Sequence, residues 1–425
     1  MKLPKLKLLF VFIITLNVLP GGCTESQQEV ERPEKIYSKR QVIYDTETYV
    51  KLADLWKKYY DVFPSEDAYA NWMYATRYAS LPDYENLLLK GFDKYPSNPT
   101  ILYLTSMLRH GSTDNLEALH MLEKAAGLDP SYTDPLFSLI MYYMEMNENE
   151  KLDHTLRKIL ETGIISDEII DYSYNMIAGI EKDAILITNG DNDTYPGWIL
   201  NRIVKYRLDV KIVNRSMLNT EWYPGYLINS GLPNFLGGIK IEDFRNGIMD
   251  EIKSGRMKMP DTGPFSDSLI IKLVKAAERE GVSVYFAATL YYSEGIKKYW
   301  ENGIQFGLVT LVTKPGESFY NQFNRVIDSW LNDFKTGGID SWKMQFADKG
   351  DAGRRLLMNY PAGISELLNN IKEYAPGKIL PLFNWYREHI EPLIPIEERT
   401  DLIKKWCEFK DISEIKKWCD KMGYE

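Results

Sequence analysis

The chain has 425 residues and a formal net charge of -9, and 44% of its residues are hydrophobic. This length exceeds that of one typical domain, so we expect two or three domains with enough apolar side chains to fill their cores. An acidic chain without a basic cluster argues against nucleic acid as a partner and against a membrane surface bound by charge.

The N-terminus has the pattern of a secretory signal. Three lysines lie in MKLPKLK, the apolar run Leu8 to Leu19 follows, and Gly21-Gly22 precede Cys23. The run is too short to span a membrane, which takes roughly 20 residues. The Gly-Gly-Cys end resembles a lipoprotein signal. We therefore predict a signal peptide over residues 1–22, a lipid on Cys23, and a flexible tether over 23–44. An ordinary cleaved signal before a chance cysteine is the alternative.

This pattern places the protein in the cell envelope, on the outer-membrane, periplasmic or surface face. Because no other run in the sequence reaches membrane length, we expect contact with the membrane through the lipid anchor only.

Three stretches of the first third repeat at a regular spacing. Each contains a proline between two amphipathic runs, namely Pro64, Pro96 and Pro130, which are 32 and 34 residues apart. The period resembles that of tetratricopeptide repeats, which we expect over residues 45–165. Such arrays bind a peptide or protein on their concave face, which implies an envelope protein as partner. A purely structural helical platform is the alternative.

From residue 180 to 316 the pattern changes to short apolar runs that alternate with helical ones. The runs predict strands at 184–188, 210–214, 282–288 and 306–312, and helices at 198–208 and 266–280. The first strand, helix and second strand form a βαβ unit, so these strands should be parallel. The expected fold class is α plus α/β: a helical repeat array, a small parallel-sheet α/β domain, and C-terminal helices at 317–425 that pack on it.

Polar side chains follow the first two predicted strands. Ligands of open α/β sheets bind beyond the carboxyl ends of the strands, where NGDNDTYP and then NRSMLNTEWY lie. The candidates for ligand binding are Asn189, Asp191, Asn192, Asp193, Thr194, Asn214, Asn219, Thr220, Trp222 and Tyr223.

The same region carries a family resemblance. ILITNGDNDTYPGWILNRIVKYRLDVKIVNRSMLNTEWY, from residue 185 to 223, resembles the soluble C-terminal region of multi-pass bacterial envelope proteins labelled protein O-mannosyltransferase-like. GVSVYFAATLYYSEGIKKYWENGIQFGLVTLV, from 281 to 312, fits the same region more loosely. The membrane-embedded half of that family, where catalysis is presumed to lie, has no counterpart in these 425 residues. The resemblance therefore implies an envelope glycan setting without an inherited transferase activity.

Three interpretations of NGDNDTYP compete. As an Asp-x-Asp triplet, Asp191 and Asp193 would hold a divalent cation such as Mg²⁺ or Mn²⁺ in a metal-dependent sugar-transfer enzyme. As a binding site, its polar groups and nearby aromatic rings would contact a glycan or a lipid-linked sugar. As an ordinary turn, it would use Gly190 to turn, Asp193 or Thr194 as N-cap, and Pro196 in the first helical turn.

Catalysis receives little further support from the sequence. No histidine lies between His154 and His389, so the α/β region lacks the usual general base of serine and cysteine hydrolases. No Gly-rich phosphate loop adjoins the triplet. We therefore predict a non-catalytic binding or scaffold module, with sugar transfer as the alternative.

Two cysteines lie near the C-terminus. Cys407 and Cys419 would be about 18 Å apart along one straight helix, so a disulfide requires a helix break between them. KDISE, at residues 410–414, could supply that break. A disulfide and two free thiols are both compatible with this pattern.

Overall fold

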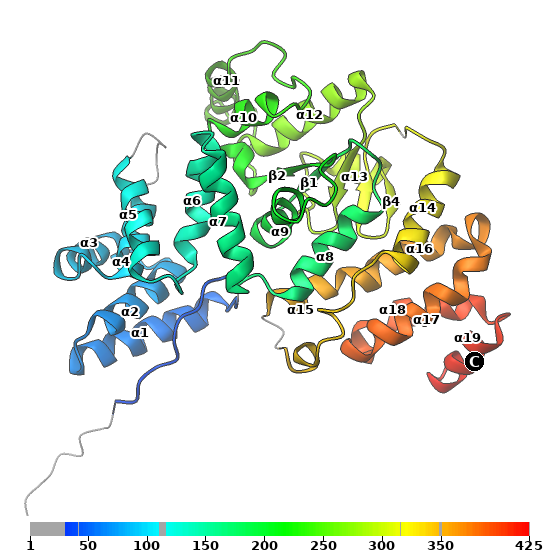
Figure 1. The fold of residues 1–425 in the computed structure, drawn as a ribbon, viewed down its shortest axis with the longest axis horizontal. Coiled ribbons are helices and arrows are strands. Elements are labelled where there is room, and N and C mark those ends of the chain that lie inside the picture. The colour runs from blue at the N-terminus through cyan, green and yellow to red at the C-terminus, as the bar shows by residue number, and fades with distance from the viewer. Residues whose placement is uncertain (1–29, 41, 110–115, 315, 348–350, 425) are drawn as a thin grey trace, which may run out of the picture.

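The computed structural model of the protein describes residues 30–40, 42–109, 116–314, 316–347 and 351–424. The predicted signal peptide and Cys23 lie outside these residues. Within the described chain, an N-terminal group of helices is followed by a five-stranded sheet with its helices and then by C-terminal helices (Figure 1). This arrangement confirms the predicted α plus α/β fold class.

The N-terminal array consists of antiparallel neighbouring helices. They are α1 Thr46–Val62, α2 Glu66–Tyr78, α3 Tyr84–Lys94, α4 Pro99–Leu108, α5 Leu116–Leu128, α6 Asp134–Glu145, α7 Asn149–Thr162 and α8 Asp167–Ala178. The repeated prolines Pro64, Pro96 and Pro130 lie just before α2, α4 and α6, where a residue without a backbone N–H ends one helix and permits the next. The expected period therefore coincides with the helix boundaries, while the tetratricopeptide assignment stays a prediction.

Side chains cap several of these helices. Ser65 accepts a hydrogen bond from the Ala68 backbone N–H, and Asn98 accepts one from Ile101. Each cap satisfies one of the N–H groups that the first turn of a helix leaves without a partner. Local sequence therefore determines where α2 and α4 begin.

The sheet has the strand order β2-β1-β3-β5-β4. Its strands are β1 Ile185–Thr188, β2 Lys211–Asn214, β3 Val284–Ala287, β4 Ile304–Phe306 and β5 Val309–Leu311. β1 pairs in parallel with β2, as the βαβ pattern predicts, and also with β3. β5 pairs antiparallel with both β3 and β4, so the sheet is mixed, which corrects the expected parallel sheet. Every residue of β1 and β3 is buried, so both faces of the sheet centre are covered.

The predicted single strand over residues 306–312 is wrong. Gly307 has a φ of 67° and turns the chain between β4 and β5, so that the two form a hairpin. A side chain at Gly307 would collide with the ring of Trp330, because its Cβ would lie 2.4 Å from that ring. An apolar run cannot reveal such a turn, since the glycine interrupts it at a single position.

The crossover helix also differs from its predicted bounds of 198–208. The observed helix, α9, spans Asp191–Arg202, so it begins within NGDNDTYP. After α9, Lys205 and Arg207 adopt positive φ angles of 63° and 47°. The Arg207 guanidinium donates to the carbonyl oxygens of Ile177 and Glu181, which holds this loop against the end of α8. Contacts distant in sequence therefore end α9 earlier than its apolar pattern indicates.

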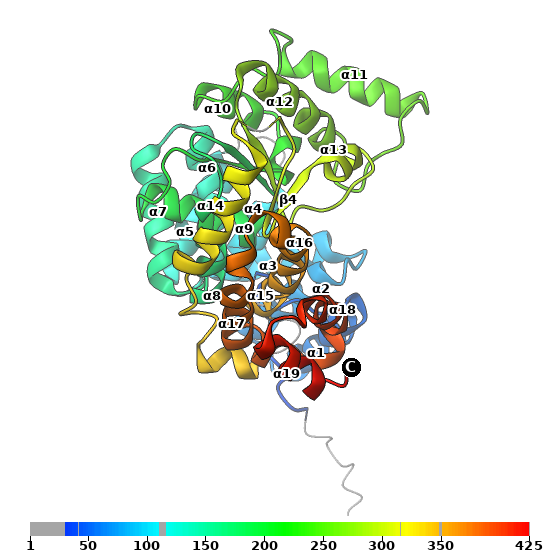
Figure 2. The same ribbon diagram turned by 90° about the vertical axis from the view of Figure 1, so that its right-hand side faces the viewer.

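The remaining helices of the α/β domain are α10 Tyr223–Asn229, α11 Ile241–Lys253, α12 Ser266–Glu280 and α13 Lys297–Asn302. Helix α12 matches its prediction and ends at Gly281, which has a φ of 70°. Helix α11 has no buried residue, and Figure 2 shows it standing at the edge of the domain.

The C-terminal helices are α14 Phe319–Asn332, α15 Ala352–Leu357, α16 Asn359–Tyr374, α17 Ile379–His389, α18 Thr400–Trp406 and α19 Ser413–Lys421. α16 contacts β4 and α14 contacts α8, so this region packs on the sheet and on the last helix of the array. Cys407 and Cys419 form a disulfide, with their Cα atoms 5.8 Å apart. The helical path is interrupted between α18 and α19, and a disulfide between cysteines 12 residues apart required such a helix break.

Residues 30–40, here called the N-terminal segment, belong to the predicted tether over 23–44, of which residues 23–29 and 41 lie outside the described residues. Residues 30–38 form neither helix nor strand, a turn follows at Lys39-Arg40, and the segment lies on the helical array before the chain enters α1, as Figure 1 shows in dark blue. Ile36 is 5% exposed and Ser38 is 8% exposed. The polar composition of this stretch concealed the docking, because backbone groups, the ion pairs of Arg40 and a single buried aliphatic side chain make the contacts.

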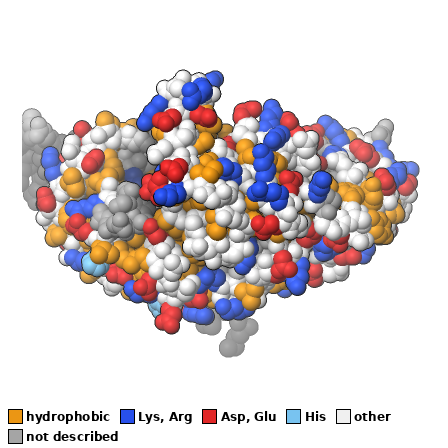
Figure 3. Space-filling view, turned by 90° about the horizontal axis from the view of Figure 1, so that it is seen from above, with side chains coloured by type: hydrophobic (Ala, Val, Ile, Leu, Met, Phe, Trp, Pro, Cys, Tyr) orange, Lys and Arg blue, Asp and Glu red, His pale blue; other side chains and the backbone are white. Residues whose placement is uncertain are grey.

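None of the described helices is both long enough and apolar enough to cross a membrane. On the face shown in Figure 3, Lys and Arg side chains are interspersed with Asp and Glu, so opposite charges lie side by side over this surface.

Candidate functional site

The NGDNDTYP stretch forms the turn after β1 and the first turns of α9. Gly190 occupies the N-cap position, and the Asp193 carboxylate accepts hydrogen bonds from the backbone N–H groups of Asn189, at 2.7 Å, and Gly190, at 2.9 Å. The predicted N-cap at Asp193 or Thr194 is therefore wrong: Asp193 is the third helical residue and reaches back to the cap. A carboxylate here also interacts favourably with the positive end of the helix dipole.

Asp193 is a structural carboxylate. Its side chain is buried, and Thr289, from the loop after β3, donates a third hydrogen bond to it. Burial raises the pKa of Asp193, and this effect outweighs the hydrogen bonds that favour the charged form. Asp193 therefore ties the ends of β1 and β3 to the start of α9.

Thr194 and Asn214 complete a second buried network. The hydroxyl groups of Thr188 and Thr194 are 2.7 Å apart, and the Asn214 side-chain amide donates to Thr194 at 3.0 Å. The Asn214 side-chain oxygen accepts from the Met217 backbone N–H, while the Asn214 backbone N–H donates to the Tyr223 hydroxyl at 3.0 Å. These predicted ligand-binding groups satisfy one another.

The other candidates after β2 also hold the fold. The Asn219 side-chain oxygen accepts from the backbone N–H groups of Phe265 and Ser266, at the start of α12. Thr220 donates to the Met217 carbonyl oxygen, and the half-buried Trp222 packs edge-on against Tyr223. Asn219, Thr220 and Trp222 thus connect the β2 loop to α10 and α12.

A buried ion pair at this edge was not among the predicted site residues. The Arg215 guanidinium contacts the Asp267 carboxylate, and both side chains are more than 90% buried. Ser293 donates to Asp267 at 2.7 Å, and Arg215 also donates to the Tyr291 carbonyl oxygen at 2.6 Å. An arginine directly after β2 and an aspartate in the first turn of α12 were the available signals, but only the fold shows that they meet.

The two carboxylates of the Asp-x-Asp triplet do not share a ligand position. Asp193 faces the backbone of its own turn, whereas Asp191 forms an ion pair with Arg40 at 2.8 Å. In the part of the chain that the structure describes, no group of three His, Cys, Asp or Glu side chains is placed to hold a metal ion. The geometry therefore gives no support to the predicted cation site.

Arg40 connects the N-terminal segment to both halves of the molecule. Besides Asp191 of α9, it contacts Asp134 at the start of α6 at 3.1 Å and lies 4.2 Å from the centre of the Phe137 ring. Burial alone would lower the pKa of Arg40, but Asp191 and its neighbours reverse the shift, so Arg40 stays charged. The Asp134 carboxylate also accepts a hydrogen bond from the Tyr74 hydroxyl.

Residues of α2, α4 and α6 face the N-terminal segment around two cavities, and this side of the array is here called the array face. A cavity of about 310 Å³ adjoins this face on the side of α9. Its lining includes Arg77, Tyr78, Tyr103, Phe137, Asn192 and Tyr195. Asn192 is half-buried and forms no side-chain hydrogen bond with a described residue. Of the predicted site residues, Asp191 and Asn192 line this cavity.

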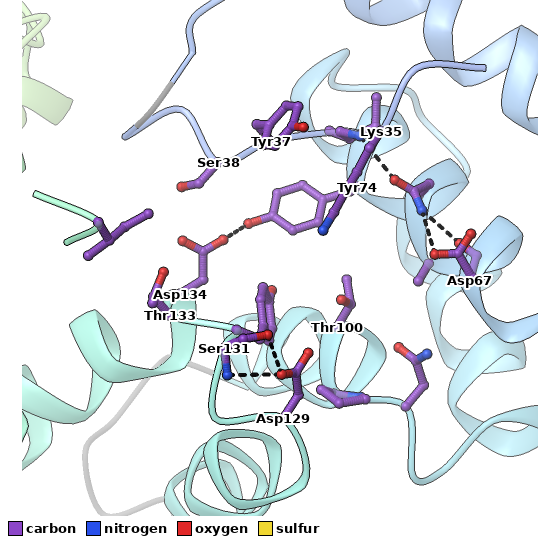
Figure 4. A pocket seen from close by; sticks show the side chains of 17 residues that line it. Lys35, Tyr37, Ser38, Asp67, Tyr74, Thr100, Asp129, Ser131, Thr133 and Asp134 are labelled. Carbon is purple, nitrogen blue, oxygen red and sulfur yellow. Dashed lines mark hydrogen bonds between the residues drawn. The ribbon is translucent and has the colours of Figure 1, made fainter. Parts of the chain in front are cut away.

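A second cavity of about 340 Å³ lies on the array face beside residues 35–38 of the N-terminal segment. Figure 4 shows Tyr37 and Ser38 of the segment along one wall and Thr100, Ser131 and Asp134 along the other. The Tyr74 hydroxyl points across the space to the Asp134 carboxylate (Figure 4). The lining is polar and aromatic, which suits contacts with a peptide backbone or a sugar.

Comparison with known proteins gives one family match. The family model described as TMEM260-associated domain 2 matches residues 169–227, which run from α8 through β1, α9 and β2 into α10. This match fits the protein O-mannosyltransferase-like family that residues 185–223 resemble, and it contains the whole NGDNDTYP stretch. No curated protein matches the chain.

Proposed function

We propose that the protein is a non-catalytic binding module of the cell envelope, in which the array face receives a partner protein and the α/β domain supports that face. The observation that carries this proposal is the location of the polar groups that remain accessible to a ligand. At the strand ends, the polar groups of Asp193 and Asn214 already form hydrogen bonds within their own domain. Beside the array face, in contrast, polar side chains line two cavities.

The setting follows from the sequence. The basic and apolar N-terminus, Gly21-Gly22 and Cys23 support attachment to a membrane by a lipid, and the family match supports a glycosylation-related context. A Cys23→Ala chain that still fractionates with membranes in the producing cell would overturn the lipid anchor.

Site-specific photo-crosslinking in cells tests the partner. A crosslinking amino acid at Asn98 or Asn192, beside the two cavities, should give a discrete adduct with one envelope protein. The matched control is Glu242 on α11, a helix without buried residues, which should not give that adduct. Equal labelling from all three positions, or no adduct from the two cavity positions, would contradict the proposal.

A saccharide at the 310 Å³ cavity is the second candidate. Tyr78 and Tyr103 line this cavity, and Asp191 and Asn192 offer polar groups beside them. Calorimetric titration of the mature chain with envelope oligosaccharides should show binding that Asn192→Ala weakens. Binding that requires both Mn²⁺ and a nucleotide sugar, and that Asp191→Ala abolishes, would instead favour the sugar-transfer enzyme.

A further inference from the structure

The N-terminal segment lies on the array face without helix or strand over residues 30–38, and a turn follows at Lys39-Arg40. Its buried residues, Ile36 and Ser38, alternate with the exposed Lys35, Tyr37 and Lys39. Alternation with a period of two is the geometry of an extended chain with one side against a surface. The array therefore holds its own N-terminal residues in the conformation in which helical repeats hold peptides.

Side chains of the array form hydrogen bonds with the backbone of the segment. The Ile36 N–H donates to the Asn71 side-chain oxygen at 3.0 Å, and the Lys39 N–H donates to the Tyr78 hydroxyl at 3.1 Å. On the other side of the segment, the Trp56 indole donates to the Glu34 carbonyl oxygen at 2.9 Å. Hydrogen bonds to backbone groups are available to any extended peptide, so these three positions do not require this particular sequence.

Two side chains add selectivity. Ile36 fills an apolar position on the array, and four residues later the Arg40 guanidinium lies between the carboxylates of Asp134 and Asp191. The side chains of Arg32 and Asp67 also pair, but both are more than half exposed, and such pairs contribute little. The recognised pattern is thus an aliphatic residue followed at the fourth position by an arginine.

The segment does not fill the surface on which it lies. The 340 Å³ and 310 Å³ cavities adjoin it at residues 35–38 and 38–40, and both are lined by α2, α4 and α6. Ser38 lines both cavities, so a peptide with a larger side chain at the position of Ser38 would reach into them. The groove therefore has room for an occupant that buries more surface than the segment does.

We propose that the array face is a groove for an extended peptide of the partner protein, and that residues 32–40 of the chain occupy this groove until such a peptide displaces them. This inference rests on the proposed function, since it names the ligand of the same face. The segment is tethered beside the groove, so it competes at a high effective concentration. A displacing peptide must therefore either bury more surface or reach a high local concentration.

The test measures binding of a fluorescent peptide with the sequence of residues 30–41 to three full-length mature chains, by fluorescence anisotropy. Wild type, whose groove is occupied, should bind the peptide at least tenfold more weakly than the Ile36→Ala chain, in which the occupant is weakened and the groove is intact. Adding Asn71→Ala to Ile36→Ala should reduce binding again, because one backbone acceptor is lost. A peptide with aspartate at the position of Ile36 is the matched control and should not bind.

Thermal unfolding provides a second readout that does not depend on the label. The unlabelled peptide should raise the Tm of the Ile36→Ala chain and leave that of wild type almost unchanged, since a ligand stabilises only the state that it binds. Equal binding of the peptide to wild type and Ile36→Ala, or no binding to Ile36→Ala at millimolar peptide, would overturn the inference. A dimer of Ile36→Ala with exchanged segments would also overturn it, because the occupant would then be a second copy of the chain.

The outcomes separate this inference from the proposed function. If the peptide binds as expected but the crosslinking amino acid at positions 98 and 192 gives no cellular adduct, the groove assignment is supported and the partner proposal fails. If the cellular adduct persists in a chain with Asn71→Ala and Tyr78→Phe while the peptide does not bind, the partner proposal stands and the groove assignment fails.

Discussion

At the carboxyl edge of the sheet, Asp193 and Asn214 bind backbone and side-chain groups of their own domain, whereas beside the array face Asn192 has no such partner among the described residues. The two regions meet at Asp191 and Asn192, within a single helical turn of α9. Residues of the same chemical type therefore serve the fold on one side of α9 and face a cavity on the other. Chemical type alone does not distinguish the two roles, because the orientation of each side chain around the helix decides them.

The largest effect should come from the buried ion pair at the sheet edge. Arg215→Ala leaves the Asp267 carboxylate buried without its cation, which we expect to lower the free energy of unfolding by about 3–5 kcal/mol. Urea unfolding followed by circular dichroism measures the change. Arg202→Ala is the control, because Arg202 and Asp153 form a partly exposed pair worth about 0–1 kcal/mol. Similar losses in both variants would contradict the structural role of the edge.

Asp193→Ala tests the same edge at its helix cap. The substitution removes the acceptor of three hydrogen bonds, and we expect it to cost about 1–3 kcal/mol in urea unfolding because buried donors lose their partner. Asp45→Ala, which removes the exposed cap of α1, should cost about 1 kcal/mol. If Asp193→Ala were neutral for stability yet abolished ligand binding, the aspartate would belong to a binding site instead.

The pH dependence of stability gives a smaller, signed effect at the same residue. Because burial raises the pKa of Asp193 in the folded state, the folded chain binds the proton more tightly than the unfolded chain. The contribution of Asp193 to stability therefore falls as the pH rises from about 4 through the raised pKa, by about 1.4 kcal/mol for each unit of the shift. The difference in unfolding free energy between wild type and Asp193→Asn should show this slope. If the unfolding free energy of wild type minus that of Asp193→Asn increased with pH over this range, the pKa of Asp193 would be lowered instead of raised.

The smallest effect on stability should come from the cavity side of α9. Asn192→Ala removes a half-buried side chain that bonds to no described residue, so the unfolding free energy should change by no more than about 0.5 kcal/mol. If the contrast between the two regions holds, this variant alters ligand binding while Asp193→Ala alters stability. A loss of stability comparable to that of Asp193→Ala would remove the contrast.

Much of the fold follows from local sequence. The apolar runs at 184–188 and 210–214 contain the observed β1 and β2, and the pattern ending at Gly281 matches α12, because these elements depend on local apolar periodicity and local turn residues. The apolar pattern predicts a start of this helix at residue 198, whereas α9 begins at Asp191. Its N-cap is Gly190, and the Asp193 carboxylate accepts hydrogen bonds from the backbone N–H groups of Asn189 and Gly190. The Thr289 hydroxyl that completes this cap lies 96 residues further along the chain, so no local pattern contains it.

The candidate site was predicted in part. Asp191 and Asn192 line the 310 Å³ cavity. Half of the other candidates are buried, namely Asp193, Thr194, Asn214 and Tyr223, and they form hydrogen bonds at the edge of the sheet. Tyr78 and Tyr103 of the same cavity carried no distinguishing signal, since aromatic residues at helical spacing are usually part of a core. The docking of residues 30–40 was likewise invisible, because a polar, charged stretch has the composition of a free tether.

By itself the sequence determined the order of the three parts, the parallel βαβ unit and the presence of helices that begin after Pro64, Pro96 and Pro130. These features depend on periodicity and on residues close together in the chain. Only the tertiary structure decided that Arg40 lies between Asp134 and Asp191, that Arg215 meets Asp267, and that the open space lies beside the array. Such contacts depend on how distant elements pack. Arginine and aspartate are also common on solvated surfaces, so their residue types do not reveal these contacts.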